Sequence, residues 1–242
     1  MQWRADPNFS RLRFGRRELV LHRDVAAFAE SILSGLESLS SAGQSGAGNR
    51  QSAFRLNLEG GPEMFARRSR RGGLIQSILA DVYFGMNPRP LQELAVTIEA
   101  TRRGIPVVEP MGAMVEWIGP ALYRGFFLTR AMRGMTLWEF VQTDDDPVVR
   151  GHVLRQTRVA IDTMHEKGLF HADLNLHNLL VTQAGESFGV MILDLDKSRL
   201  LDAPLSPAMR RMNFARLLRS VNKLDREGKY FDAGALAILN SE

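Results

Sequence analysis

Ten residues in the C-terminal half of the 242-residue sequence read His171-Ala172-Asp173-Leu174-Asn175-Leu176-His177-Asn178-Leu179-Leu180, and no other segment constrains the architecture so strongly. An Asp and, five residues later, an Asn fall in a loop expected between a helix and a strand. An Asp carboxylate can accept the proton of a substrate hydroxyl, and an Asn amide oxygen can help to hold Mg²⁺. Taken alone, His-x-Asp also fits a turn in which the Asp caps a helix.

A second acidic segment, Ile192-Leu193-Asp194-Leu195-Asp196, begins its acids sixteen residues after Asn178. A carboxylate at the exposed end of a buried strand is costly for structure alone, although a strand end or a calcium-like loop also fits the pattern. In this order the two segments resemble the kinase catalytic loop H-R-D-x-x-x-x-N followed by D-F-G, with Asp196 in the place of the glycine. We therefore predict Asp173 as the catalytic base and Asn178, Asp194 and Asp196 as ligands of Mg²⁺.

Two upstream features agree with this pattern. Gly46-Ala47-Gly48 precedes a predicted strand, where backbone N–H groups can approach phosphates, although Gly-Ser linkers look the same. The kinase pattern expects a lysine on the following strand, and Arg67 occupies that place in Met64-Phe65-Ala66-Arg67. Glu93 is its expected partner on the next helix, unless it is a surface acid. We predict that Gly46, Gly48, Arg67 and Glu93 form the ATP site.

The periodicity of apolar residues predicts strands in the first part of the chain and helices later. A helix capped by Asp24 is expected through Leu36, and a glycine turn is expected to join strands 52–58 and 63–67. Further predicted helices are 74–84, 90–103, 147–167 and 207–224, and further predicted strands are 17–22, 114–118, 122–128, 179–182 and 190–193.

The composition is that of an ordinary globular protein, with 45% apolar and 24% charged residues and no cysteine, which excludes disulfides and thiolate chemistry. No apolar run approaches a membrane span and no secretory leader is visible, so we expect a soluble or peripheral protein. The net charge is +4, and Arg67, Arg68, Arg70 and Arg71 form a basic cluster. Nucleic acid, anionic lipid or a phosphorylated substrate would each match such a cluster.

Several segments together resemble the lipopolysaccharide kinase family. They extend from about Gly46 to Lys223, and the most specific are the arginine-glycine segment, the Asp-x-Asp-Lys ending and the Arg-Ser-x-Asn-Lys tail. The matching segments are 67–75, 89–93, 104–107, 171–180, 192–197 and 217–223. Arginine at the lysine position is tolerated in that family, so Arg67 does not argue for an inactive protein.

The resemblance implies an α+β, protein-kinase-like fold with two lobes. We expect an N-terminal extension over 1–44, a small antiparallel-sheet N-lobe over 45–132 and a reduced helical C-lobe over 133–242. It also implies ATP and Mg²⁺ as cofactors and phosphorylation of a Kdo sugar on lipid A, at its 4-hydroxyl, on the cytoplasmic face of a bacterial inner membrane. The expected partners are Kdo-lipid A and an anionic membrane surface, and not nucleic acid.

Two other functions fit the same residues. One is a related kinase that acts on a core heptose or on a protein. No A-P-E motif follows Asp196, which favours a small or lipid-linked acceptor over a protein. The other is a pseudokinase-like binding module, supported by Arg67 and Asp196 but opposed by the presence of Asp173, Asn178 and Asp194.

Overall fold

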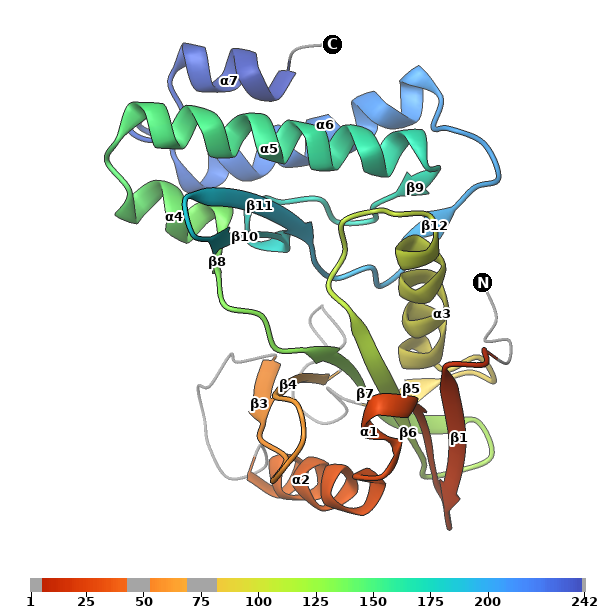
Figure 1. The fold of residues 1–242 in the computed structure, drawn as a ribbon. Coiled ribbons are helices and arrows are strands. Elements are labelled where there is room, and N and C mark those ends of the chain that lie inside the picture. The colour runs from red at the N-terminus through yellow and green to blue at the C-terminus, as the bar shows by residue number, and fades with distance from the viewer. Residues whose placement is uncertain (1–5, 43–52, 69–81, 241–242) are drawn as a thin grey trace. The chain divides into compact units, whose positions relative to one another are not determined.

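The structure, a computed structural model, describes residues 6–42, 53–68 and 82–240, without the side chains of 40–42 and 240. The chain divides into two compact units, each of which is described by itself (Figure 1). The first unit contains Met1–Ile98 and Glu109–Ala131, and the second contains Glu99–Val108 and Met132–Glu242. Within the described residues both helices and antiparallel sheets are present, as expected for an α+β chain.

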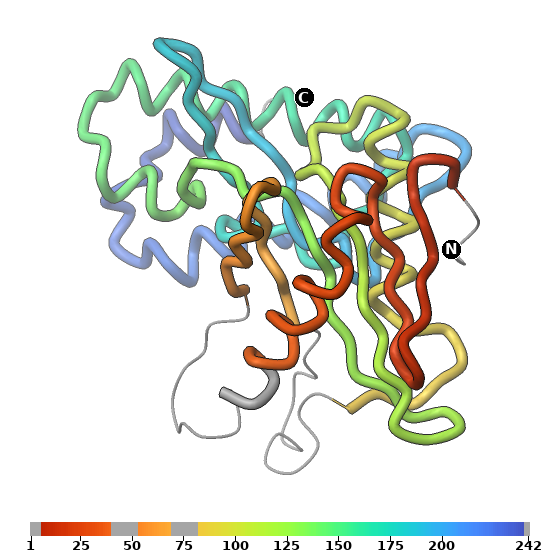
Figure 2. Tube along the Cα trace, turned by 60° about the horizontal axis from the view of Figure 1, so that its bottom comes forward, coloured from red at the N-terminus to blue at the C-terminus, as the bar shows by residue number. Residues whose placement is uncertain are grey.

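The first unit is organised around an antiparallel sheet with the strand order β1-β2-β6-β7-β4-β3, in which β5 also pairs with β7. The strands are β1 Phe9–Phe14, β2 Arg17–His22, β3 Ala53–Leu56, β4 Met64–Arg68, β5 Tyr83–Phe84, β6 Pro110–Trp117 and β7 Leu122–Arg130. The β3–β4 hairpin confirms the predicted pairing of 52–58 with 63–67, and β6 and β7, predicted as strands, form a second hairpin. Figure 2 shows the β1–β2 hairpin in red beside β6.

Each face of this sheet is covered by its own apolar cluster. Because side chains alternate along a strand, Leu19 and Leu21 of β2 point to one face and Val20 points to the other. Leu19 and Leu21 share a cluster with Ile32 of helix α2 (Ala29–Ala42). Val20 shares the opposite cluster with Leu94 of helix α3 (Arg89–Arg102). Helix α3 therefore lies on one face of the sheet and α2 on the other.

The N-terminal part of the chain differs from prediction in two places. The helix expected after Asp24 is divided into α1 (Arg23–Ala26) and α2, and the N-cap of α1 is His22, whose Nδ1 accepts the Asp24 N–H. Tyr83–Phe84, expected to end a helix over 74–84, form strand β5, and the start of that helix lies outside the described residues. Strands β1 and β2 belong to the expected extension 1–44 yet join the main sheet. The predicted boundaries at 44/45 and 132/133 stay a prediction.

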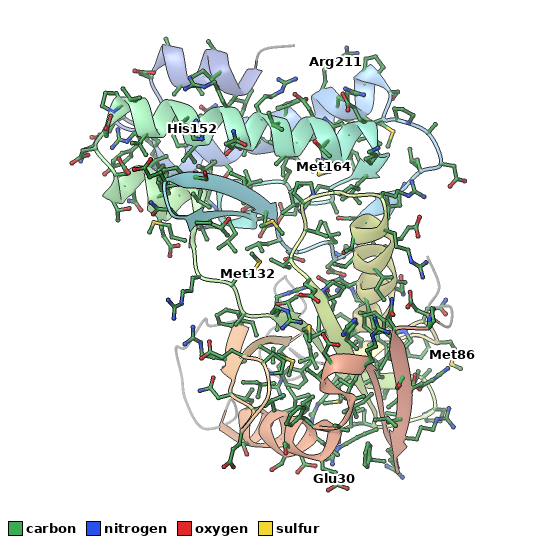
Figure 3. The ribbon with its side chains drawn as sticks, in the orientation of Figure 1. Glu30, Met86, Met132, His152, Met164 and Arg211 are labelled. Atoms are coloured by element: carbon green, nitrogen blue, oxygen red, sulfur yellow. The ribbon has the colours of Figure 1, made fainter. Side chains whose placement is uncertain are left out.

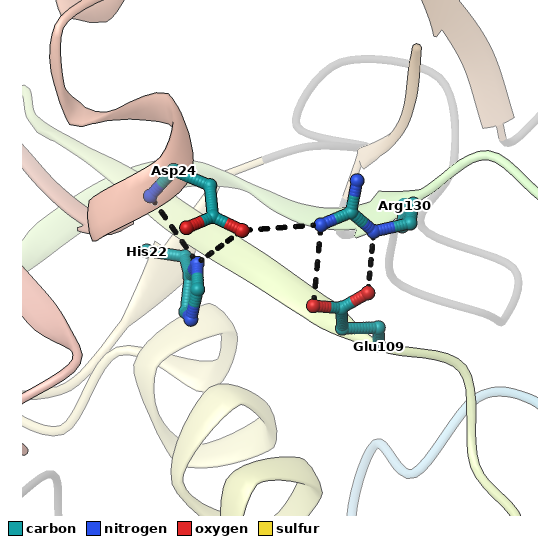
Figure 4. A network of polar contacts seen from close by, with 4 residues as sticks. All are labelled: His22, Asp24, Glu109 and Arg130. Carbon is teal, nitrogen blue, oxygen red and sulfur yellow. Dashed lines mark hydrogen bonds and ion pairs between the residues drawn. The ribbon is translucent and has the colours of Figure 1, made fainter. Parts of the chain in front are cut away.

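A polar network joins α1 to the end of β7 (Figure 4). The Arg130 guanidinium bonds Glu109 through Nε and lies 3.3 Å from the Asp24 carboxylate. The hydrogen bond that Arg130 donates to Glu109 raises the pKa of Arg130, which keeps the guanidinium charged. His22, Asp24 and Glu109 place their ligand atoms within 4.8 Å of one another. Arg130 already supplies the positive charge that these acids require, so the network is structural.

The second unit has longer helices and short strands. Its helices are α4 Leu137–Thr143, α5 Pro147–Glu166, α6 Pro207–Leu224 and α7 Ala233–Asn240, with a 3₁₀ turn η1 at Leu176–Asn178. Strands β8 Met135–Thr136, β10 Leu179–Ala184 and β11 Ser187–Ile192 form one antiparallel sheet, and β9 Leu169–Phe170 pairs with β12 Arg199–Leu200. Helix α5 packs against β11 and α7. No helix among the described residues is long and apolar enough to cross a membrane.

Helix α5 and the short strand β9 precede the loop that carries Asp173 and Asn178. Asp146 caps its start by accepting the Val148 N–H at 2.8 Å, and Met164 packs on its buried side (Figure 3). The helix ends before Gly168, which has a φ of +83°. A Cβ there would lie 2.5 Å from the Leu201 carbonyl oxygen, so only glycine allows the start of β9 to lie so close to the end of β12.

Candidate active site

The loop between β9 and β10 carries Asp173 and Asn178, and backbone hydrogen bonds fix its shape. The Asn178 side-chain amide donates to the Asp173 carbonyl oxygen at 2.8 Å, and the Asn175 amide donates to the same oxygen at 3.0 Å. The Asp173 carboxylate is left exposed. Because the Asn178 NH₂ group is engaged in this way, its amide oxygen faces away from the loop and is available to a ligand.

Asp194 follows β11 in a conformation that few residues other than glycine adopt. Its φ is +56°, and Lys197 has a φ of +60°. Such backbone angles carry strain and cluster at functional sites. The Asp196 N–H donates to the Asp194 carboxylate at 3.3 Å, and the intervening Leu195 is buried. The turn therefore leaves Asp194 partly exposed and places the side chain of Leu195 in the core.

His171 joins the loop to the segment that carries Asp194. Its Nδ1 accepts the Asp173 N–H at 3.1 Å, so its Nε2 carries the proton and donates to the Leu193 carbonyl oxygen at 2.9 Å. Burial lowers the pKa of His171, which agrees with a neutral ring. The Leu193 N–H also donates to the Asn178 carbonyl oxygen at 2.9 Å. Asp173, Asn178 and Asp194 thus stand on segments that are hydrogen-bonded to one another.

Helix α6 supports the same loop through residues that the sequence did not reveal. The Asn213 side-chain amide donates to the His171 carbonyl oxygen at 2.6 Å and its oxygen accepts the His171 N–H at 3.3 Å. The Ser220 hydroxyl accepts the Leu176 N–H at 3.2 Å. Asn213 is fully buried, in phase with Leu217 and Val221 on the apolar side of α6. The signal in the sequence was a polar amide residue in phase with the apolar residues of this helix, and it was not recognised as a site residue.

Three of the predicted site residues line one pocket of about 730 Å³ in the second unit. These are Asp173, Asn178 and Asp194, and the pocket is also lined by Asn175, His177, Arg216, Arg219, Ser220, Asn222, Lys223 and Leu224. Asp196 is not among the lining residues. Carboxylate and amide oxygens suit Mg²⁺, a hard cation that prefers oxygen ligands. The donor set of Asp194 and Asn178 therefore fits the predicted metal.

Arg67 and Glu93 form an ion pair in the first unit. Arg67 Nη2 lies 2.5 Å from both carboxylate oxygens of Glu93, whose side chain is only 2% exposed. The register of the sheet explains the partner. Arg67 stands opposite Phe127 in the cluster on the α3 face, whereas Arg68 stands opposite Phe126 in the cluster on the α2 face. Arg67 is thus directed to the helix that carries Glu93.

Arg68 is not part of an exposed basic surface, because it is buried and its guanidinium lies 5.4 Å from the centroid of the Phe126 ring. Arg68 is therefore a buried member of the basic cluster that the sequence showed, and the prediction that this cluster meets an anionic partner stays a prediction for its other members. Arg70, Arg71, Gly46 and Gly48 lie outside the described residues.

Comparisons with known proteins relate this chain to a family of kinases. Residues 43–233 match the model of the "Lipopolysaccharide kinase (Kdo/WaaP) family". A 3-deoxy-D-manno-octulosonic acid kinase of Xylella fastidiosa (strain 9a5c) is 33% identical over 184 residues, which cover 73% of this chain and 68% of the relative. A protein of the same name from Vibrio cholerae is 27% identical over 179 residues, 72% of each chain.

The solved structure described as WaaP in complex with acyl carrier protein shows the same fold at 15% identity. Its TM-score is 0.52, with coverage of 80% of this chain and 76% of that chain. Residues 43–233, which match the family model, contain the loop with Asp173, the turn with Asp194 and the pair of Arg67 with Glu93. The chain belongs to the lipopolysaccharide kinase (Kdo/WaaP) family.

Proposed function

We propose that this kinase transfers the γ-phosphoryl group of ATP to a hydroxyl, expected to be the 4-OH, of the Kdo sugar on lipid A. The observation that carries the proposal is the single pocket lined by Asp173, Asn178 and Asp194. The relatives named Kdo kinases support the choice of acceptor. Phosphoryl transfer requires mainly positioning and charge neutralisation, and a pre-ordered loop with exposed oxygen ligands supplies both.

Asp173 is assigned to the acceptor. Its exposed carboxylate accepts the proton of the sugar hydroxyl as the hydroxyl oxygen bonds to the γ-phosphorus and the bond to ADP breaks. Asn178 and Asp194 are assigned to Mg²⁺, with Asp196 as a further ligand. When bound, Mg²⁺ neutralises charge on the phosphate oxygens. The hydrogen bonds at Asn178 and the strained turn at Asp194 support these roles, because they aim oxygen atoms at the pocket.

The nucleotide phosphates are assigned to Arg67, which Glu93 holds in place. The Glu93 carboxylate is buried, whereas the Arg67 side chain is partly exposed, so an anion can approach the guanidinium from the solvent side. The fork of an arginine can hold phosphate through two bonds, which a lysine cannot. The glycines Gly46 and Gly48 are assigned to the phosphates through their backbone N–H groups.

The proposal includes the kinase-like arrangement of an N-lobe over 45–132 and a C-lobe over 133–242. It also places the protein at the cytoplasmic face of the bacterial inner membrane, where Arg70 and Arg71 contact anionic lipid. Each such arginine is expected to contribute about 1 kcal/mol near the surface.

The direct test is mass spectrometry of lipid A bearing one Kdo, incubated with the protein, ATP and Mg²⁺. The expected product carries one added phosphate, which fragmentation assigns to Kdo, and NMR of the purified product assigns it to the 4-position. Lipid A without Kdo serves as the control acceptor and is expected to stay unmodified.

Other outcomes of this experiment separate the alternatives. Phosphate found only on a heptose-bearing core acceptor would identify the related kinase with a different sugar. Tight ATP binding without transfer to any sugar acceptor would favour the pseudokinase-like module and reject the proposal.

A further inference from the structure

Helix α6 carries five cations and no acid. The cations are Arg210, Arg211, Arg216, Arg219 and Lys223. Three of them line the pocket of Asp173, Asn178 and Asp194. Their spacing of three and then four residues places Arg216, Arg219 and Lys223 on one side of the helix. We call these three side chains the α6 cation row.

The α6 cation row is held in a fixed place relative to the catalytic loop. Asn213 bonds both backbone groups of His171 and Ser220 accepts the Leu176 N–H, so the helix is attached on either side of Arg216 and Arg219. The Arg216 guanidinium lies 5.3 Å from the centroid of the Phe170 ring, one residue before the loop begins. Because the helix is anchored in this way, the row stays beside the loop of Asp173 and only its exposed side chains must be ordered on binding.

Arg216 packs on Phe170, and the other two members of the row differ from it. Arg219 and Lys223 are exposed, and within the described part of the chain no Asp or Glu lies within ion-pair distance of them. The two acids of the pocket, Asp173 and Asp194, already have roles in the proposed reaction. Solubility alone does not explain why three cations gather at the pocket, whereas an incoming anion does.

We propose that the α6 cation row, with Arg219 and Lys223 foremost, binds the carboxylate of the acceptor sugar and thereby selects an acidic sugar over a neutral one. This rests on the proposed function, in which the acceptor is 3-deoxy-D-manno-octulosonic acid. The carboxylate and the reacting hydroxyl belong to one sugar, so binding the first orients the second toward Asp173. The guanidinium fork of Arg219 matches a carboxylate through two parallel bonds. A pocket of this size is typical of small-molecule sites.

Lipid A phosphates carry the same kind of charge, so the test uses three acceptors. They are Kdo-lipid A, the same molecule with the Kdo carboxylate converted to a primary amide, and Kdo-lipid A stripped of its lipid A phosphates. The variants are Arg219→Gln, Lys223→Gln and the control Arg211→Gln. Arg211 is exposed on the same helix but lines another pocket, with Arg158 and Phe214 (Figure 3).

With Kdo-lipid A, Arg219→Gln is expected to raise the acceptor KM about tenfold or more, because a charge-assisted contact is lost, while the KM for ATP stays within about twofold. Lys223→Gln should have a similar but smaller effect, and Arg211→Gln none. With the amide acceptor, the acceptor KM of wild type should be as high as that of Arg219→Gln with the natural acceptor. Arg219→Gln should not raise the KM for the amide acceptor any further. An unchanged acceptor KM in Arg219→Gln overturns the proposal. The proposal is also overturned if the KM rise persists with the amide acceptor and disappears with the acceptor that lacks lipid A phosphates, because Arg219 would then bind those phosphates.

A second measurement separates this inference from the proposed function. Free Kdo is titrated into wild type and Arg219→Gln while the arginine side-chain Nε–H signals are followed by NMR, with Kdo amide as the neutral probe. We expect a saturable shift of the Arg219 signal with the acid and none with the amide. If wild type fails to phosphorylate Kdo-lipid A yet shows this shift, the proposed function fails and the carboxylate site stands. If the acid gives no saturable shift at Arg219, the site is rejected whatever the turnover.

Discussion

The loop with Asp173 and the pair of Arg67 with Glu93 are ordered by different means. The loop is held by backbone hydrogen bonds, by neutral His171 and by Asn213, which is fully buried. Arg67 and Glu93 meet through an ion pair between a strand and a helix. Hydrogen bonds of fixed geometry set positions to within a fraction of an ångström, whereas an ion pair mainly sets charge. Changes in the loop should therefore lower kcat, and changes in the pair should alter nucleotide affinity.

After the loss of the Asp173 carboxylate, the largest effect that this comparison predicts is at the turn with Asp194. Asp194→Asn removes a charged oxygen ligand but keeps the shape of the side chain and its tolerance of a positive φ. Turnover is expected to fall about 10²–10³-fold, and nucleotide binding should lose its dependence on Mg²⁺. Kinetics and calorimetry with and without Mg²⁺ measure both. Normal Mg²⁺-dependent binding in the variant would remove Asp194 from the metal site.

A second prediction concerns the pH dependence of stability through His165, which bonds Asn213 through Nε2 at 3.2 Å. Burial lowers the pKa of His165 to about 4, from a usual 6.5, and the nearby Arg210 and Arg158 lower it while Asn213 and Asp162 raise it. Between these pH values the unfolded chain binds the proton and the folded chain does not. Stability is therefore complete above about pH 6.5 and falls as the pH decreases toward 4, by roughly 3 kcal/mol from this group.

Urea unfolding at pH 7, 5.5 and 4.5 measures this loss. His165→Gln keeps a donor for Asn213 but does not titrate, so its stability should change less over the same range. Equal slopes for wild type and variant would show that another group controls the acid sensitivity.

Asn213 gives the next smaller effect. Asn213→Ala leaves both backbone groups of His171 without this partner, which should cost about 1–3 kcal/mol of stability. Because the loop loses its support, kcat should fall further than the KM for ATP rises. Thermal unfolding and steady-state kinetics test the two parts, with Arg211→Ala as a control at an exposed position of the same helix that does not line the pocket of Asp173. A destabilised variant with wild-type kcat would show that Asn213 stabilises the fold but does not position the loop for catalysis.

The smallest effect is expected at the ion pair. Glu93→Gln keeps a hydrogen-bond acceptor for Arg67 but removes the buried charge, so the KM for ATP should rise about tenfold with little change in the acceptor KM. Glu99→Gln, on the same helix, is the control. A change in kcat with an unchanged KM for ATP would contradict the expectation that the loop controls kcat and the ion pair controls nucleotide affinity.

The parts of the fold that follow from local rules were predictable from the sequence. Helix α6 has the predicted bounds because Ser206 caps it and Pro207 occupies its first turn. Helices α3 and α5 agree within one residue at each end, and each is followed by a glycine with positive φ, Gly104 and Gly168, a residue type that commonly ends helices. Local pattern also placed Asp173, Asn178 and Asp194 in loops next to strands.

Features that depend on distant contacts were not predictable. Asp24 was expected to cap a helix, but its carboxylate is engaged by Arg130, 106 residues away in the sequence. The pairing of β2 with β6 joins segments that no local pattern connects. The support of His171 by Asn213 spans 42 residues. The sequence indicated only that an amide lay on an apolar stripe, and not which backbone groups it would satisfy.

The most direct test of the account is the carboxylate of Asp173. Asp173→Asn keeps the backbone hydrogen bonds of the loop, because those bonds involve the main chain of residue 173 and not its side chain. ATP binding should survive, while phosphorylation of Kdo-lipid A should slow by about 10²–10⁴-fold, the usual contribution of a positioned base. Single-turnover transfer, measured after equal ATP binding has been established, gives the answer. Near wild-type transfer by this variant would contradict the assignment of the loop.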